Sequence, residues 1–270
     1  MTKIPFTKMS GAGNDFIVID NRDDKLHGDL TEFVKTACTR RISIGADGVL
    51  LLENHPDADF RMRYYNADGG EVEMCGNGAR CIARFAFLNG AAGPTMTFES
   101  MAGRHRAEII GEEVKVEMTP PHGLQLEFPL DINQRQLIAH FLNTGVPHVV
   151  LFTEDIDRVD MVGVGRPIRY HQMFQPAGTN ANYVQVMDTH TLKLRTYERG
   201  VEDETLACGT GATAAAIIAG MLGNVKSPTT VITRSGIPLV IHYHLHDQEI
   251  RDVFLQGEAR VVYQAEYLFE

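Results

Sequence analysis

The sequence lacks an excess of basic residues and lacks any long hydrophobic run. Its 270 residues include 25 Lys and Arg against 35 Asp and Glu, which gives a formal net charge of −10. Because nucleic-acid binding depends on clustered positive charge, this balance argues against a nucleic-acid partner. The most apolar helical stretch, residues 212–222, is too short and too rich in Ala and Gly to cross a bilayer, so no membrane segment is expected.

Motifs that would indicate secretion or a cofactor are also missing. The opening MTKIPFTKMSGAG has no apolar core of a signal peptide, so we expect a cytoplasmic protein with reduced cysteines. None of the four cysteines lies in a Cys-x-x-Cys pair, which leaves a structural zinc site without support. The chain has no Gly-x-Gly-x-x-Gly, no phosphate-binding Gly-Lys-Ser/Thr loop and no lysine context typical of pyridoxal phosphate. We therefore expect neither a metal nor another cofactor.

A cysteine-bearing motif occurs twice, as CGNGA from Cys75 and as CGTGA from Cys208, 133 residues further on. Other matches keep this spacing: Gly45 with Gly178, Asp47 with Asn180, Tyr64 with Tyr197, Ala83 with Ala216, and Ala86 with Ala219. Because the matches run from residue 45 to residue 86 at one spacing, they predict a duplicated domain and not a chance motif.

Both halves show a similar order of predicted elements. A helix is expected after each motif, and another at residues 29–41 with Asp29 as its N-cap. Pro120-Pro121 marks a boundary, so the expected domains are 1–119, joined by a returning strand within 258–270, and 120–257. Alternating apolar and β-branched residues predict strands at 15–20, 49–53, 61–65, 95–99, 104–110, 114–118, 149–153, 183–187, 193–197, 230–233, 239–245, 253–256 and 259–267.

Each motif places its cysteine at the start of a helix. The glycines that follow allow a sharp turn and the close approach of a ligand, and the first helical turn leaves N–H groups unpaired at the positive end of the helix dipole. Such a site can bind a carboxylate, and a cysteine there has a lowered pKa and more thiolate. Two such thiols on opposite faces of one carbon suit the inversion of that carbon, because one removes a proton and the other delivers one.

The segments around these cysteines resemble those of the diaminopimelate epimerase family. They run from residue 8 to beyond residue 215 and read KMSGAGNDFIVID, YYNADGGEVEMCGNGARCIARF, GVPH, GTNANYVQV and YERGVEDETLACGTGATAAA. The resemblance implies an α/β (α+β) fold of two pseudo-symmetric domains, each a barrel-like antiparallel or mixed sheet around a central helix, with the active site in the cleft between them. It also implies a cofactor-independent, homodimeric isomerase that interconverts LL-2,6-diaminopimelate and meso-diaminopimelate in lysine and peptidoglycan precursor synthesis.

The resemblance assigns roles to individual residues. It implies that Cys75 and Cys208 form the acid–base pair. His148 would orient and activate Cys75, and Glu198 would do the same for Cys208. The family's substrate-binding positions, including the backbone N–H groups that hold the α-carboxylate, correspond to Asn14, Asn66, Gly76, Asn77, Asn180, Arg199, Gly209 and Thr210.

Other functions remain open from the sequence. Many family members read Gly-Asn-Pro-His where this chain has Val146 in GVPH, and some carry glutamine at the position of Gly48. Val146 keeps open a racemase of another amino acid, such as histidine or a proline derivative, on the same scaffold. A thiol redox sensor is less favoured, because Glu198 and Arg199 would then have no purpose. A non-catalytic binding module is disfavoured because both motif cysteines are present.

The remaining cysteines and a histidine run have structural interpretations. Cys38 and Cys81 are predicted to lie in the core. In HYHLH, residues 242–246, three histidines share one face of a predicted strand and could hold a metal. A strand face turned to solvent is favoured, because no carboxylate or cysteine spacing supports a metal site.

Overall fold

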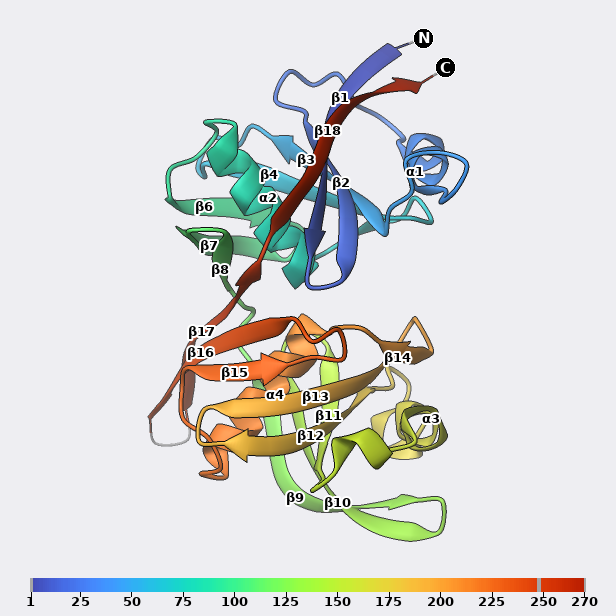
Figure 1. Ribbon diagram of the computed structural model, residues 1–270, viewed down its shortest axis with the longest axis vertical. Coiled ribbons are helices and arrows are strands. Elements are labelled where there is room, and N and C mark those ends of the chain that lie inside the picture. Colours follow the sequence, from blue (N-terminus) through green and yellow to red (C-terminus); the bar gives the residue numbers. More distant parts are fainter. Residues whose placement is uncertain (1, 247–248, 270) are drawn as a thin grey trace. The chain divides into compact units, whose positions relative to one another are not determined.

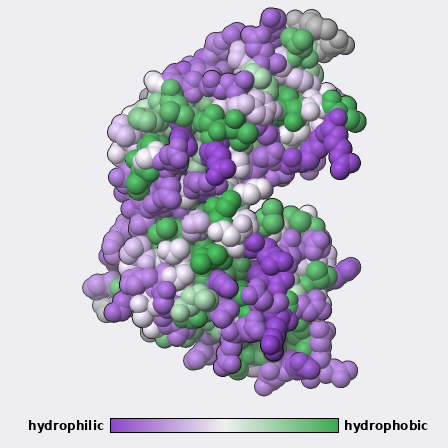
Figure 2. Space-filling view, in the orientation of Figure 1, coloured by the Kyte–Doolittle hydropathy of each residue, from purple (hydrophilic) through white to green (hydrophobic). Residues whose placement is uncertain are grey.

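The computed structural model describes residues 2–246 and 249–269 and divides the chain into two compact units (Figure 1). Unit 1 comprises Met1–Glu117 with Gly257–Glu270, and unit 2 comprises Met118–Gln256. Within the described ranges, no helix has both the length and the apolar character that a membrane crossing requires. Figure 2 shows hydrophilic side chains over most of the visible face of each unit, with hydrophobic ones scattered among them.

Unit 1 is a mixed sheet that surrounds one helix, α2. Its strands pair in the order β18–β1–β2–β3–β4–β6–β7–β8, and β5 is added on β4. The buried side chains of α2 form one core with side chains from strands along this whole sheet. The elements are β1 Thr2–Gly11, β2 Asn14–Asp20, α1 Thr31–Cys38, β3 Gly48–Glu53, β4 Phe60–Asn66, β5 Glu71–Val72, α2 Gly76–Leu88, β6 Thr95–Ser100, β7 Gly103–Ile110, β8 Glu113–Glu117 and β18 Arg260–Phe269.

Unit 2 repeats this plan around α4. Its strands pair in the order β9–β10–β11–β12–β13–β15–β16–β17, with β14 added on β13. The helix α4 is apolar on nearly every side and is buried against these strands. The elements are β9 His122–Ile132, β10 Arg135–Asn143, β11 Pro147–Phe152, η1 Ile156–Arg158, α3 Met161–Arg169, η2 Gln172–Phe174, β12 Asn180–Asp188, β13 Thr191–Glu198, β14 Asp203–Thr205, α4 Gly209–Met221, β15 Thr229–Ile232, β16 Pro238–His246 and β17 Glu249–Glu258.

The expected α+β fold is confirmed, and each unit has the same succession of pairings. The helices α2 and α4 are equivalent and keep the spacing of 133, since they run from Gly76 to Leu88 and from Gly209 to Met221. In both units the third and fourth strands of this order are parallel, and so are the fifth and the strand that follows the central helix. These shared features are what a duplicated domain would produce.

Equivalent strand residues of the two units, however, are 132 residues apart in the sequence, one fewer than the spacing of the cysteine motifs. Strand β3 pairs Leu50 with Tyr64, whereas β12 pairs Asn182 with Thr196. Tyr64 therefore corresponds to Thr196, and the expected match with Tyr197 is wrong. In the same register Asn180 corresponds to Gly48, so the expected match of Asp47 with Asn180 is also wrong. The burial agrees with this, because Tyr64 lies in the core around α2 while Tyr197 lies in the core that contacts α3. The turn before the second cysteine is one residue longer, which restores the spacing at the helix.

The predicted helix at 29–41 is shorter than expected. It begins at Thr31 and ends at Cys38. The backbone N–H of Thr31 donates to the carboxylate of Asp29 at 2.9 Å, but Leu30 occupies the N-cap position. The chain leaves the helix at Thr39, whose backbone is extended with φ −66° and ψ 109°, and the N–H of Gly45 donates to the carbonyl of Ala37 at 2.9 Å.

Candidate active site

The two motif cysteines occupy the same structural position in their units. Cys75 is the N-cap of α2 with φ −138° and ψ 116°, and Cys208 is the N-cap of α4 with φ −133° and ψ 108°. The carbonyl of each cysteine accepts the first helical hydrogen bond, from Ala79 at 2.7 Å and from Ala212 at 2.9 Å. Each sulfur is therefore held at the positive end of a thirteen-residue helix.

Glycine occupies the third helical position in both turns, where the space for a side chain is small. A Cβ on Gly78 would lie 3.2 Å from a methyl group of Leu50. A Cβ on Gly211 would lie 2.6 Å from the side-chain oxygen of Asn182 and 3.3 Å from the sulfur of Cys208. The backbone of each helix thus approaches the underlying strand closely, and the approach is tighter in unit 2.

The first turns of α2 and α4 contain the backbone N–H groups that the resemblance assigns to a carboxylate. By helix geometry the N–H groups of Gly76, Asn77, Gly209 and Thr210 have no acceptor within their own helix. In unit 2 this turn is braced, because the Thr144 hydroxyl donates to the carbonyl of Thr210 at 2.9 Å. The Thr210 hydroxyl also lies 3.4 Å from the sulfur of Cys208. Each unit therefore offers backbone donors beside a cysteine, which is suited to an anionic group.

In unit 1 a chain of side-chain amides leads away from the cradle. Asn77 donates to the side-chain oxygen of Asn14 at 2.7 Å, and Asn14 donates to the carboxylate of Asp47 at 2.9 Å. The oxygen of Asn77 accepts from the buried guanidinium of Arg80 at 2.8 Å. The structure thus brings two predicted substrate-binding residues, Asn14 and Asn77, into direct contact. Asn66 ends β4 in the register position opposite Gly48.

In unit 2 the predicted residues Asn180 and Arg199 are connected. The Asn180 side-chain oxygen accepts from the backbone N–H of Arg199 at 2.7 Å, and its amide donates to the carbonyl of Pro147 at 3.2 Å. The Arg199 guanidinium donates to the carbonyl of Ala177 at 3.0 Å. Asn180 also lies opposite His148 in the parallel pair of β11 and β12.

His148 is fully buried and neutral. Burial, together with the positive charge of Arg199, lowers the pKa of His148 to about 3. Its Nδ1 lies 3.1 Å from the amide nitrogen of Asn182. Its Nε2 is buried and has no hydrogen-bond partner within the described part of the chain.

Glu198 is the last residue of β13 and is half-buried. Burial raises the pKa of its carboxyl group, and the nearby Thr205 side chain opposes that shift. A raised pKa favours the protonated carboxyl group, which can donate as well as accept a hydrogen bond.

The other cysteines are confirmed as core residues. Cys38 and Cys81 are buried, and burial raises the pKa of the Cys38 thiol to about 11 and that of Cys81 to about 12. The histidine run in β16 faces outward, as expected, with His244 exposed and Ile241 and Tyr243 buried on the other face. His242 shares a hydrogen bond with Gln256 at 2.8 Å, which gives it a structural partner.

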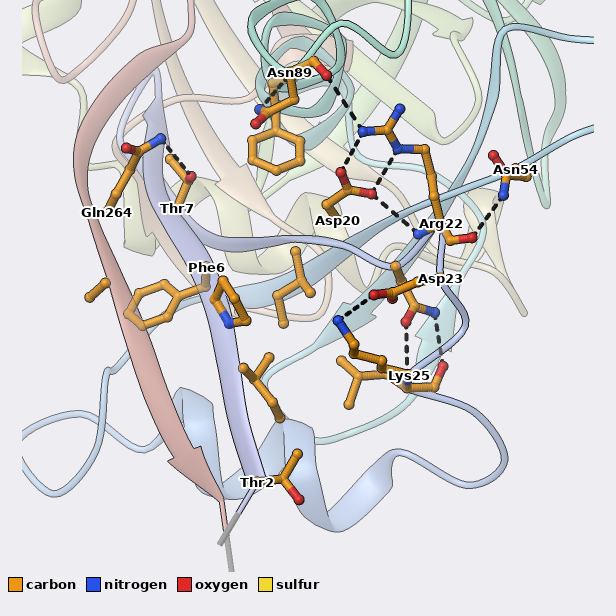
Figure 3. Close-up of a pocket in the computed structure, with 17 residues that line it drawn as sticks. Thr2, Phe6, Thr7, Asp20, Arg22, Asp23, Lys25, Asn54, Asn89 and Gln264 are labelled. Atoms are coloured by element: carbon orange, nitrogen blue, oxygen red, sulfur yellow. Dashed lines mark hydrogen bonds and ion pairs between the residues drawn. The ribbon is translucent and has the colours of Figure 1, made fainter.

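Figure 3 shows a cavity in unit 1 that is lined largely by residues of β1, β2 and β18. It measures about 750 Å³ and has an apolar wall that includes Phe6, with charged groups along one side. Those charges pair with one another, since Arg22 binds Asp20. None of the residues predicted for the active site lines this cavity, so its position does not connect it with the cysteine chemistry.

Several residues of the site were not predicted from the sequence. They are Asp47 and Arg80 in unit 1 and Asn182 and Thr196 in unit 2. Arg80 could have been predicted from the sequence, because it is a charged residue among apolar helix residues that must be buried. Asn182 and Thr196 could not have been predicted in this way, because their pairing depends on the strand register.

Comparison with known proteins gives a consistent result. The family model described as Diaminopimelate epimerase matches residues 6–123 and 140–262. The diaminopimelate epimerase of Aquifex aeolicus is 46% identical over 271 residues, covering 96% of each chain. That of Chlorobaculum tepidum is 44% identical over 261 residues, covering 95% of this chain and 98% of the relative.

Solved structures with low sequence identity share the fold. A PhzF-family phenazine biosynthesis protein from Bacillus anthracis has a TM-score of 0.76 at 15% identity, with 100% of both chains covered. A hydroxyproline epimerase from Agrobacterium vitis has a TM-score of 0.70 at 14% identity, covering 98% of this chain and 92% of its own.

Proposed function

The chain belongs to the diaminopimelate epimerase family, and we propose that it interconverts LL-2,6-diaminopimelate and meso-diaminopimelate. The observation that carries the proposal is the cysteine at a helix N-cap, built once in each unit with nearly the same backbone angles. A reaction that inverts one carbon needs equivalent chemistry on its two faces, and the duplicated turn supplies two equivalent groups. The proposal requires both units to act on one substrate.

In this reaction one cysteine acts as a thiolate and the other as a thiol. The thiolate takes the proton from the substrate α-carbon, so that the C–H bond breaks, an S–H bond forms and the electron pair stays on carbon. The opposite thiol gives its proton to the other face of that carbon, and the configuration inverts. Cys75 and Cys208 exchange roles in the reverse direction. The step consumes no co-reactant and transfers no electron to or from the protein.

Backbone donors stabilise the negative charge that develops during proton removal. We assign to the substrate α-carboxylate the first-turn N–H groups of Gly76 and Asn77 in α2 and of Gly209 and Thr210 in α4. Because the helices fix these donors before the substrate binds, they need no reorganisation when charge appears. The helix dipoles act in the same direction.

Polar side chains near the cradles are assigned to the rest of the substrate and to the thiols. Amides such as Asn14, Asn66 and Asn180 can accept from an ammonium group and donate to a carboxylate, and the guanidinium of Arg199 suits the distal carboxylate. We further assign His148 to Cys75 and Glu198 to Cys208. The raised pKa of Glu198 supports its assignment, because a carboxyl group that holds its proton more readily is better suited to donate a hydrogen bond to a thiolate.

The family membership also supports a cytoplasmic homodimer that works without pyridoxal phosphate in lysine and peptidoglycan precursor synthesis. Sedimentation of the purified protein would test the dimer. Activity that persists after treatment with hydroxylamine, which removes pyridoxal phosphate from enzymes that need it, would test independence from that cofactor.

The deciding experiment is proton NMR of LL-diaminopimelate with the reduced protein in heavy water. We expect the α-proton signal to disappear as the meso form appears. Cys75→Ala and Cys208→Ala should each abolish epimerisation, whereas Cys38→Ala, a buried cysteine of the same unit as Cys75, should retain it. Turnover of another amino acid far above diaminopimelate would overturn the substrate assignment. Near-native activity in either motif variant would overturn the two-thiol reaction.

A further inference from the structure

A buried polar triad occupies positions in unit 2 where unit 1 has apolar contacts. The equivalent residues are Phe16, Leu50 and Tyr64 in unit 1, and His148, Asn182 and Thr196 in unit 2. All six are buried, and those of unit 1 belong to the core around α2. Buried polar groups cost free energy unless they are hydrogen-bonded. A duplicated domain that needed only a core at these positions would have kept apolar side chains in both copies.

The triad lies under the start of α4. A Cβ on Gly211 would come within 2.6 Å of the side-chain oxygen of Asn182 and within 3.3 Å of the hydroxyl oxygen of Thr196. The same Cβ would lie 3.3 Å from the sulfur of Cys208. The hydrogen bonds of the triad are therefore part of the layer beneath the start of α4 and beside Cys208.

The side-chain amide of Asn182 can take only one orientation. Its nitrogen lies 2.9 Å from the carbonyl oxygen of Val149, which can only accept, so the NH₂ group must point there. The oxygen on the other side accepts from the hydroxyl of Thr196 at 2.9 Å. Reversing the amide would set two carbonyl oxygens against each other. Both ends of the amide are thus fixed by partners whose roles are known.

This orientation decides where the proton of His148 lies. The second hydrogen of the Asn182 NH₂ group points at Nδ1 of His148, 3.1 Å away. An amide nitrogen has no lone pair to offer, so Nδ1 must be the acceptor. The proton of the neutral ring is then on Nε2, which is the ring atom that lacks a partner within the described part of the chain.

We propose that Asn182, held by Thr196 and by the carbonyl of Val149, is a positioning residue that fixes His148 as the Nε2–H tautomer, a hydrogen-bond donor. The inference deepens the function proposed above and rests on it for the identity of the group served, the thiolate of Cys75. In this tautomer Nε2 has no lone pair to receive a proton from a thiol, and the lone pair of Nδ1 is engaged by Asn182. His148 therefore activates the cysteine by stabilising the thiolate and does not deprotonate the thiol. The low pKa of His148 agrees with this, because the ring stays neutral over the working range of pH.

The direct test is NMR of protein labelled with ¹⁵N in its histidine rings. The signals of His148 are identified by their absence from His148→Gln. We expect a protonated Nε2 and an unprotonated, hydrogen-bond-accepting Nδ1, with no change between about pH 6 and pH 9. A proton on Nδ1, or on both nitrogens at neutral pH, would overturn the proposal. This readout needs no substrate, so it stands even where the protein proves inactive on diaminopimelate.

Two variants of nearly the same size separate positioning from packing. Asn182→Leu introduces the residue found at the equivalent position of unit 1 and removes the donor to Nδ1. Asn182→Asp puts an acceptor there, which should move the proton from Nε2 to Nδ1. In Asn182→Asp we expect kcat to fall by about 100-fold or more, as a misplaced tautomer does in other enzymes, with a much smaller change in KM.

A matched control removes a buried hydroxyl of unit 2 far from this triad. Thr229 lies in β15 and its hydroxyl donates to the carbonyl of Lys226 at 3.0 Å. Thr229→Val should leave both the His148 spectrum and kcat as in the parent protein. If Asn182→Asp shifts the tautomer but kcat is unchanged, the positioning role is wrong. If the expected tautomer is found in a protein with no epimerase activity, the proposed function fails and the fixed tautomer remains.

Discussion

The buried, neutral state of His148 predicts a specific loss of stability in mild acid. In the folded protein the pKa of His148 is about 3, whereas its value in the unfolded chain is near 6.5. Below pH 6.5 the unfolded chain takes up a proton that the folded protein cannot bind. The free energy of unfolding must therefore fall as the pH falls from 6.5 toward 3, and this contribution is absent above 6.5.

The size of the effect follows from the distance to the unfolded pKa. At pH 5 the unfolded ring is protonated and the folded ring is still neutral, and the gap of about 1.5 pH units corresponds to about 2 kcal/mol. Replacing His148 with Gln removes this term and leaves the other buried histidines, His105 and His140, unchanged. The difference in unfolding free energy between parent and variant should therefore move by about 2 kcal/mol between pH 8 and pH 5, to the disadvantage of the parent.

The measurement is urea unfolding of both proteins at a series of pH values. The chain has no tryptophan, so far-UV circular dichroism is the appropriate signal. Because His148 lies in unit 2, the comparison uses the transition that shifts in the His148→Gln protein. A difference that stays constant from pH 8 to pH 5 would mean that the folded protein accepts the proton on His148, and the neutral, fixed ring would be refuted.

Three further substitutions test the supporting layer and the substrate end. Gly211→Ala should destabilise the protein by about 1–3 kcal/mol and lower kcat, because its Cβ meets a fixed amide oxygen. The Cβ of Gly78→Ala meets only a methyl group, so urea unfolding should show a smaller loss of stability, and equal losses in the two variants would contradict this. Arg80→Met should lower kcat/KM about tenfold by releasing the side chain of Asn77, and unchanged steady-state kinetics would show that this bond does not matter. Val146→Asn restores the residue common in the family, so KM for diaminopimelate should fall with kcat unchanged; a KM that does not fall would remove position 146 from the substrate contacts.

The sequence predicts the repeat, the central helices and most strands, because these follow from periodicity and from a long motif. It does not predict β1 and β9, in which Pro5 and Pro129 interrupt the pattern of a strand. Nor does it predict β10 or the short strands β5 and β14. It also does not predict α3, whose nine residues contain Gly163, Gly165 and Pro167. These elements form because the rest of their unit supplies the burial and the pairing that the local sequence lacks.

The misassigned strand register explains why the triad could not be found from the sequence. A constant spacing of 133 residues aligns Tyr64 with Tyr197, so the alignment does not reveal that Thr196 is the equivalent residue. A shift of one residue moves every side chain of a strand to the other face of the sheet. The tyrosine identity belongs to the opposite face, since Tyr65 and Tyr197 both lie in cores away from the central helix. Only the observed pairing shows which residues lie beneath each cysteine.

The two units share the cradle but not the layer beneath it, and the difference has a chemical meaning. Arg80 and Thr213 hold the same position in α2 and α4, and each donates to the carbonyl one turn back, at 3.3 Å from Gly76 and 2.9 Å from Gly209. One copy thus buries a guanidinium near its cysteine and the other buries a neutral hydroxyl. The polar triad is present only where the cation is absent.

In the proposed reaction the substrate carbon must be approached from both faces, which accounts for the similar backbone turns. The groups that set the protonation of each thiol need not be alike, because the substituents around the reacting carbon are not mirror-symmetric. If the proposed reaction is right, exchanging Leu50 for Asn in unit 1 should add no activity, whereas Asn182→Leu should remove it. If Asn182→Leu also unfolds at the same urea concentration as the parent protein, the polar triad would be shown to serve a thiol and not the general stability of the fold.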